Sequence, residues 1–186
     1  MGPAPFIVVL DANVLYPFTL RDTLLRAAAA GFYQARWSSQ ILEETTRNVV
    51  RNTGMTAEGA NRLVATMNRV FPEASVTGHE LLIGAMPNED KDRHVAAAAV
   101  AAGAQVIVTA NLRDFQVLPG AIEAQSPDEF LGNLFDLDPD GFVGLLRDQA
   151  SDLKKPPLSF DELLERLERM VPTLVATVRA HVAPAG

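Results

Sequence analysis

Two short apolar runs, each followed closely by polar residues, limit the fold of this chain more than any other feature. The first covers residues 6–10 and ends at Asp11, and the second covers residues 105–109, with Asn111 two positions further on. Apolar runs that do not alternate with polar residues are typical of strands buried on both faces of a parallel sheet. Helical patterns separate the two runs, as expected for crossover connections. We therefore predict an α/β domain with a central parallel sheet.

The character of the chain changes at residue 126. A helix start, Ser-Pro-Asp-Glu at 126–129, is followed by no further strand-like run. The remaining pattern predicts three helical stretches, at residues 130–135, 139–153 and 159–182. Pro172 lies inside the third stretch and should kink or split it. We predict a domain at residues 1–125 and a helical C-terminal extension at residues 126–186.

Composition excludes several classes of protein. The chain has no cysteine, so neither a disulfide framework nor a thiolate metal site is available. The net charge of −7 argues against general, charge-driven binding of nucleic acid. The charge is uneven, however: the net is −2 over residues 1–125 and −5 over residues 126–186, which leaves room for a local basic patch. No apolar run is long enough to span a bilayer and no secretory signal is present, so we expect a cytoplasmic protein.

Acidic residues occur at four places where α/β proteins build sites. Asp11 and Asp114 follow the two predicted strands, Asp92 (with Asp90) begins an alanine-rich helix, and Glu44 lies early on another helix. Ligands of open α/β sheets bind beyond the carboxyl ends of the strands. Clustered carboxylates repel one another unless a cation or a proton is present. Oxygen ligands without cysteine suit Mg²⁺ or Mn²⁺.

Each of these residues also has an ordinary structural explanation when it is taken alone. A single acid is often a helix cap, a turn former or part of a solvated helix face. Asn13 and Asn111 are common turn residues. His94, at the start of an apolar helix, is more typical of a structural or substrate-facing side chain than of a metal ligand. The joint occurrence of the acids, in this order and at these positions, favours a site.

Four short stretches, in this order, resemble the PIN-domain nucleases and specifically the VapC toxins of bacterial toxin–antitoxin pairs. They are Val-Leu-Asp-Ala-Asn-Val-Leu at 9–15, Ser-Gln-Ile-Leu-Glu-Glu at 39–44, Asp-Lys-Asp-Arg-His-Val-Ala-Ala-Ala at 90–98 and Val-Thr-Ala-Asn-Leu-Arg-Asp-Phe at 108–115. The helical tail is similar to the extension found in one subgroup of these toxins. The resemblance implies a three-layer α/β/α fold and Mg²⁺- or Mn²⁺-dependent cleavage of RNA.

The resemblance also implies the site residues. Carried over by position, Asp11, Glu44, Asp92 and Asp114 form the catalytic acidic site, and all of these except Glu44 are metal ligands. Glu43 competes with Glu44, which we prefer because the family motif places its acid two residues after the leucine.

The sequence departs from the family pattern at one position. Many PIN domains have aspartate where Asn111 stands, so the division of roles between Asn111 and Asp114 stays open. Asp90 is similarly an alternative or supporting ligand beside Asp92.

Other polar residues adjoin the acids in the sequence. Asn13 and Thr109 are placed to form hydrogen bonds within the site. Lys91, Arg93 and Arg113 are candidates for contacts with the RNA backbone, although ordinary surface charge explains them equally well.

Toxins of this kind resemble one another in their partners, which implies an RNA substrate (tRNA or ribosomal RNA), a small cognate antitoxin and a homodimer. Two alternatives differ in class. The first is a catalytically silent PIN-like scaffold that binds RNA or protein. The second is a haloacid-dehalogenase-type phosphatase with Asp11 as its nucleophile, a family that carries a second aspartate where Asn13 stands.

Overall fold

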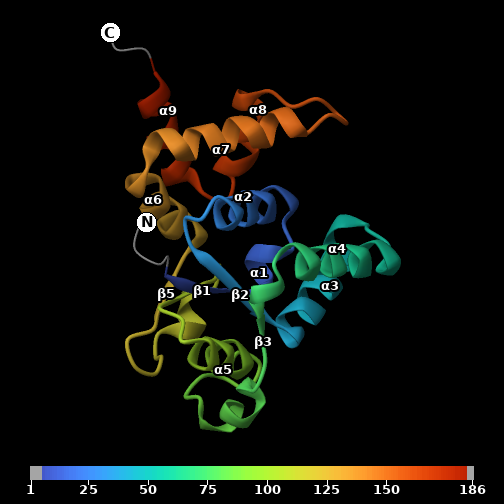
Figure 1. Cartoon of the computed structure of the whole chain (residues 1–186), viewed down its shortest axis with the longest axis vertical. Coiled ribbons are helices and arrows are strands. Elements are labelled where there is room, and N and C mark those ends of the chain that lie inside the picture. Colours follow the sequence, from blue (N-terminus) through green and yellow to red (C-terminus); the bar gives the residue numbers. More distant parts are fainter. Residues whose placement is uncertain (1–5, 184–186) are drawn as a thin grey trace. The chain divides into compact units, whose positions relative to one another are not determined.

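The structure, a computed structural model, describes residues 6–183 and divides into two compact units. The first combines the residues up to Pro17 with Tyr33–Gln125, and the second combines Phe18–Phe32 with the residues from Ser126 onward. Figure 1 follows the elements along the chain. In order they are β1 (Ile7–Leu10), α1 (Ala12–Leu15), α2 (Phe18–Ala29), β2 (Gln34–Ser38), α3 (Ser39–Thr53), α4 (Ala57–Val70), η1 (Pro72–Ala74), β3 (Ser75–Val76), η2 (His79–Ala85), α5 (Arg93–Ala102), β4 (Val106–Val108), η3 (Leu112–Phe115), β5 (Glu123–Gln125), α6 (Pro127–Leu137), α7 (Pro139–Asp152), α8 (Phe160–Glu168) and α9 (Pro172–Val182).

The first unit is built on a five-stranded parallel sheet in the order β3-β2-β1-β4-β5. The two apolar runs of the sequence form β1 and β4, which pair directly, with Leu10 opposite Val108. Most of their side chains are completely buried. The predicted parallel sheet is therefore confirmed. Because β1 and β4 end side by side, the residues that follow them, Asp11 and Thr109, are brought together at one edge of the sheet.

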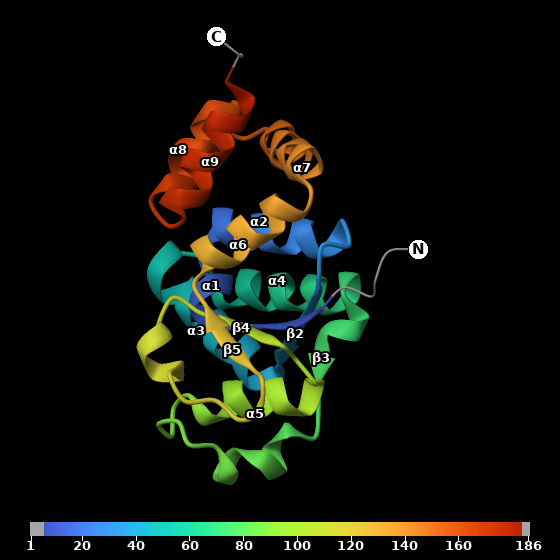
Figure 2. The ribbon, with the colours of Figure 1, turned by 90° about the vertical axis from the view of Figure 1, so that its left-hand side faces the viewer.

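Helices cover both faces of this sheet. Figure 2 shows α5 on one face and α4 on the other. The inner positions of α5 are alanines with no exposed surface, whose small side chains let the helix approach the strands closely. Gly103 ends α5 with a φ of 64°, a conformation that glycine adopts without strain. The three-layer α/β/α arrangement implied by the family resemblance is confirmed.

The second unit is entirely helical within the part of the chain that the structure describes. It contains α6 to α9, and α2 packs with them, mainly against α7 and α8. The first unit ends at Gln125, and the segment Phe18–Phe32 groups with the residues from Ser126 onward. Pro172 splits the third helical stretch, as expected, because it occupies the first turn of α9. Across residues 6–183, no helix combines the length and apolar character needed to cross a membrane.

A buried polar contact links α2 to α7 and provides a test of this packing. The Gln149 side chain, which has no exposed surface, accepts a hydrogen bond from Thr23 Oγ1 (2.8 Å) and donates one to the Thr19 carbonyl (3.2 Å). Gln149→Leu keeps the approximate shape but removes both bonds, so we expect it to lower the free energy of unfolding by about 1–3 kcal/mol. Urea unfolding followed by circular dichroism measures this loss. Asp148→Ala, at the exposed neighbouring position, is the control, and equal stability of the two variants would contradict the assignment.

Candidate active site

Asp11 lies at the centre of the candidate site, at the end of β1 and at the N-terminus of α1. Its Oδ1 accepts a hydrogen bond from the backbone N–H of Ala12 (2.7 Å). Its Oδ2 accepts one from Thr109 Oγ1 (2.9 Å) and one from Asn13 Nδ2 (3.0 Å). Only 7% of the residue is exposed. Asp11 thus caps the helix, as its ordinary structural role requires, while its carboxylate stays fixed at the edge of the sheet.

Asn13 and Thr109 join the ends of β1 and β4. The Asn13 amide also donates to Thr109 Oγ1 (3.1 Å), and its Oδ1 accepts from the backbone N–H of Ala110 (3.0 Å). Thr109 Oγ1 in turn accepts from the backbone N–H of Asn111 (3.1 Å). Both residues therefore hydrogen-bond around Asp11, where the sequence analysis placed them.

The environment of Asp11 disfavours its charged form. Burial is the main cause and raises the pKa of Asp11 to about 6. The hydrogen bonds from Thr109 and Ala12 act in the opposite direction but are weaker than the burial. The negative charge of Glu44 raises this pKa further and the charge of His94 lowers it. A buried carboxylate of this kind gains stability from any cation brought beside it.

Glu44 reaches the site from α3 and pairs with His94 from α5. Glu44 Oε1 lies 2.9 Å from His94 Nε2, while Arg47 is more distant, at 4.0 Å. His94 is buried, and its Nδ1 has no hydrogen-bond partner within residues 6–183. The sequence suggested a structural or substrate-facing role for this histidine and gave no sign of its pairing with Glu44.

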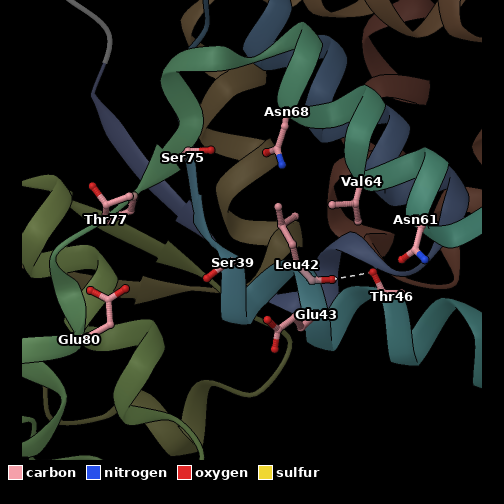
Figure 3. A pocket seen from close by; sticks show the side chains of 11 residues that line it. Ser39, Leu42, Glu43, Thr46, Asn61, Val64, Asn68, Ser75, Thr77 and Glu80 are labelled. Carbon is pink, nitrogen blue, oxygen red and sulfur yellow. Dashed lines mark hydrogen bonds between the residues drawn. The ribbon is translucent and has the colours of Figure 1, made fainter.

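Glu43, the alternative to Glu44, points elsewhere. It lines a separate cavity of about 350 Å³ between α3 and α4, drawn in Figure 3 together with Asn61 and Asn68. The dashed line in that view is the bond that the Thr46 hydroxyl donates to the backbone carbonyl of Leu42. Of the two adjacent glutamates, only Glu44 therefore contacts His94.

Asp92 and Asp114 form a second acidic group around Lys91. Lys91 Nζ lies 3.3 Å from Asp114 Oδ2 and 3.9 Å from Asp92 Oδ2. Asp92 Oδ2 is buried and accepts no hydrogen bond from any described residue. Burial is the largest cause of the raised pKa of Asp92; Lys91 opposes it, and the negative charges of Asp114 and Glu89 add to it. His94 interacts electrostatically with Asp92 as well as with Asp11, which connects the two acidic groups.

The remaining predicted residues lie around this second group. Asn111 Nδ2 donates to Asp114 Oδ2, so the two residues that compete for one role are in contact with each other. The Asp90 side chain is 92% exposed and pairs with Arg93 (2.8 Å), which directs it toward solvent. Arg113 is exposed and lines a cavity next to Asp114.

Sequence reasoning missed Asn88. This buried side chain donates from Nδ2 to the backbone carbonyls of Asp114 (3.0 Å) and Val117 (3.3 Å). It ties the loop before α5 to the turn after β4. The sequence gave no signal for this role, because an asparagine within a polar loop is an ordinary turn residue.

The acids suit a hard divalent cation in their chemistry. Their donors are carboxylate oxygens, the type of ligand that Mg²⁺ and Mn²⁺ prefer. The buried Asp92 Oδ2 lacks a hydrogen-bond donor, and burial penalises the charge of Asp11. Within residues 6–183, no three acidic or histidine side chains converge closely enough to hold one ion as they stand. The type of donor thus suits a cation, whereas in this structure the positive charge beside Asp114 and Asp92 comes from Lys91.

Comparison with known proteins defines the class. The PIN-domain family model matches residues 7–113, more than half of the chain, and the model described as the VapC50 C-terminal domain matches residues 127–180. The chain belongs to the PIN-domain family and carries a C-terminal region of the VapC50 type, as its sequence motifs predicted. Among curated proteins it is similar to "Putative ribonuclease VapC50" from Mycobacterium tuberculosis (strain ATCC 25618 / H37Rv), with 38% identity over 112 residues. The match covers 59% of this chain and 66% of that relative, slightly under two thirds of its length.

Proposed function

We propose that this protein is a divalent-metal-dependent endoribonuclease that hydrolyses RNA phosphodiesters and acts as the toxin of a toxin–antitoxin pair. The observation that carries the proposal is the placement of Asp11. It is a buried carboxylate held by three hydrogen bonds where β1 and β4 end, and it interacts electrostatically with Glu44 and His94. Membership of the PIN-domain family and the similarity to a relative named as a ribonuclease support the same function.

Each acid has a defined part in the proposed mechanism. Asp11, Asp92 and Asp114 would hold Mg²⁺ or Mn²⁺. When bound, the cation would neutralise these carboxylates and act as a Lewis acid toward the phosphodiester. Asn13 and Thr109 keep the Asp11 carboxylate in one orientation. The Glu44 side chain is 33% exposed, so water reaches it, and its carboxylate orients the attacking water and accepts a proton from it.

Cationic side chains beside the acids are the proposed contacts for the RNA backbone. The side chain of Lys91 is 64% exposed, and Arg113 forms no ion pair with any residue from 6 to 183. Arg93 is less available, because it pairs with Asp90 and its Nε donates to the Asn88 carbonyl (2.9 Å). Lys91 and Arg113 are therefore the side chains most available to RNA, and Lys91 is the first choice for binding phosphate.

The proposed partners follow from the proposed class. They are a tRNA or ribosomal RNA substrate, a small antitoxin and a second copy of the chain, all in the cytoplasm. An antitoxin arginine placed against the carboxylates would compensate their charge in place of a metal.

A catalytically silent scaffold is the second candidate. It is favoured by one observation: Lys91 already pairs with Asp114 and lies near Asp92, and no three acids of the described chain converge. The match to the PIN-domain family leaves the phosphatase alternative without support.

Cleavage of total RNA by the purified, antitoxin-free protein tests the proposal. We expect discrete products in Mg²⁺ or Mn²⁺ and none in EDTA. Asp92→Asn should slow cleavage about 100-fold or more, because it removes a charge that the cation requires. It should not destabilise the fold, since burial already disfavours that charge. Asp148→Asn, on the exposed face of α7, is the matched control and should cut like the wild type.

The other outcomes separate the alternatives. Equal cleavage by Asp92→Asn alone would remove Asp92 from the mechanism, and equal cleavage by both the Asp92→Asn and Asp11→Asn variants would show that a contaminant cuts the RNA. Folded protein that binds RNA or Mn²⁺ but yields no products would move the scaffold ahead of the nuclease.

A further inference from the structure

A cavity of about 420 Å³ opens directly beside the second acidic group. Its lining includes Lys91, Asp114 and Arg113, which belong to the proposed site, and Asn88, Gln116 and Val117, which have no part in the proposed mechanism. The volume falls within the range of about 300–1,000 Å³ that is usual for small-ligand sites. Because the cavity shares Asp114 with the acidic group, a molecule bound in it lies next to the place where the phosphodiester would react.

Hydrogen bonds hold the walls of this cavity in place. Asn88 is 7% exposed and donates to the backbone carbonyls of Asp114 and Val117, which also line the cavity. The backbone carbonyl of Asn88 accepts a hydrogen bond from Arg93 Nε at the start of α5. The loop before α5 and the turn after β4 are thus bound to each other. A ligand would meet a preformed cavity and would lose little affinity to the ordering of loops.

The charges around the cavity do not favour an anion alone. Lys91 and Arg113 are balanced by Glu89 and Asp114, and Lys91 lies within 4 Å of both acids. A phosphate in the middle of this group would meet repulsion as well as attraction. A ligand without net charge in the cavity, attached to a phosphate at its edge, matches the arrangement better.

The surface chemistry of the cavity fits a flat, polar-edged ring. Val117 is 64% exposed, so its apolar side chain is available to cover one face of a ring. Arg113 has no ion pair with any residue from 6 to 183, and guanidinium planes stack on bases. The Gln116 amide offers both a donor and acceptors for the edge of a base.

We infer that this cavity binds one unpaired nucleobase of RNA, adjacent to the phosphate that the acidic site acts on. Arg113 and Val117 contact the faces of the base, and Gln116 contacts its edge. Bases within an A-form duplex are stacked and paired, so the subsite selects single-stranded segments. The inference rests on the proposed function, since it takes RNA to be the substrate of the acidic site.

Binding of a short, fluorescently labelled, single-stranded oligoribonucleotide tests the subsite. Anisotropy is measured on the full-length protein in EDTA, which prevents cleavage. Arg113→Ala and Val117→Ala should each weaken binding about fivefold or more, the usual effect of losing a base contact. Arg69→Ala and Val70→Ala, at the exposed end of α4, are the matched controls and should bind like the wild type. The same sequence in a duplex should bind more weakly than the single strand.

An abasic substitution distinguishes a base contact from a phosphate contact. At one position of the oligoribonucleotide, removal of the base should weaken binding to the wild type but cause no further loss in the Val117→Ala protein. Lys91→Ala should weaken binding of both oligoribonucleotides by the same factor, because it contacts the backbone.

These experiments distinguish failure of the subsite from failure of the proposed function. Normal RNA cleavage with unchanged affinity in both cavity variants overturns the subsite alone. RNA binding that depends on Arg113 and Val117, without any cleavage, supports the subsite and removes the nuclease. Absence of both RNA binding and cleavage overturns both.

Discussion

Asp11→Asn will abolish cleavage while leaving a folded protein. The variant keeps an oxygen that accepts the hydrogen bond from the Ala12 backbone, so the cap of α1 survives. It loses the negative charge that the proposed cation requires, and we expect the rate to fall about a thousandfold. Single-turnover cleavage of a defined RNA product measures the loss. Residual cleavage within tenfold of the wild type would remove Asp11 from the mechanism.

The same variant should also differ from the wild type in how its free energy of unfolding depends on pH. Burial raises the pKa of Asp11 from 3.8 to about 6, so the folded state holds this proton more tightly than the unfolded state. Between these two pH values the unfolded chain binds fewer protons, and wild-type stability falls as pH rises. Above about pH 6 Asp11 is charged in the folded state as well, and the burial of this charge lowers the free energy of unfolding by about 3 kcal/mol.

The difference in unfolding free energy between Asp11→Asn and the wild type should therefore rise from about pH 4 to about pH 6 and then level off. Urea unfolding of both proteins across this range measures it. Asp92, whose pKa is also raised, is present in both proteins, so its contribution cancels. A difference that does not change with pH would contradict the burial of an uncompensated carboxylate.

A chain that ends at Gln125 will aggregate and will not form a stable PIN-domain unit. Such a fragment keeps α2 but lacks α7 and α8, against which α2 packs. Leu20, Leu24 and Ala27 are almost completely buried in the full chain. Each leucine that becomes exposed costs about 1.5–3 kcal/mol. This is a large share of the free energy of unfolding of a typical domain, which is about 5–15 kcal/mol.

Size-exclusion chromatography and circular dichroism of residues 1–125 test this expectation. The matched control is the same fragment with Leu20 and Leu24 replaced by serine, which should be more soluble if the uncovered face of α2 causes the aggregation. A monomeric, folded 1–125 fragment with unchanged sequence would show that α2 does not need the C-terminal helices.

Much of the fold follows from local patterns in the sequence. The apolar runs predicted β1 and β4, and the proline at 172 predicted the break before α9. Helix α1 was not expected, because four residues after a strand are too few to show helical periodicity. The grouping of α2 with α7 depends on side chains 126 positions apart, such as Thr23 and Gln149, and no local pattern reports such a contact.

The candidate site, like the fold, could be predicted only in part from local sequence patterns. The sequence analysis selected Asp11, Asp92 and Asp114 because each follows a strand or begins a helix. The topology of a parallel sheet brings such positions to one edge. The side chains that contact these acids could not be predicted in this way. The pairing of Glu44 with His94 and the clamp formed by Asn88 depend on how loops and helices pack, which sequence spacing does not report.

The division of the chain into units also concerns the order in which the protein is made. A ribosome synthesises α2 before any strand except β1, yet the helices that bury it, α7 and α8, are synthesised after the whole sheet. The nascent chain therefore carries an apolar helix, α2, that stays unpartnered until the last helices leave the exit tunnel. Completion of the fold is tied to completion of translation, so an interrupted chain lacks the finished structure of the full-length protein.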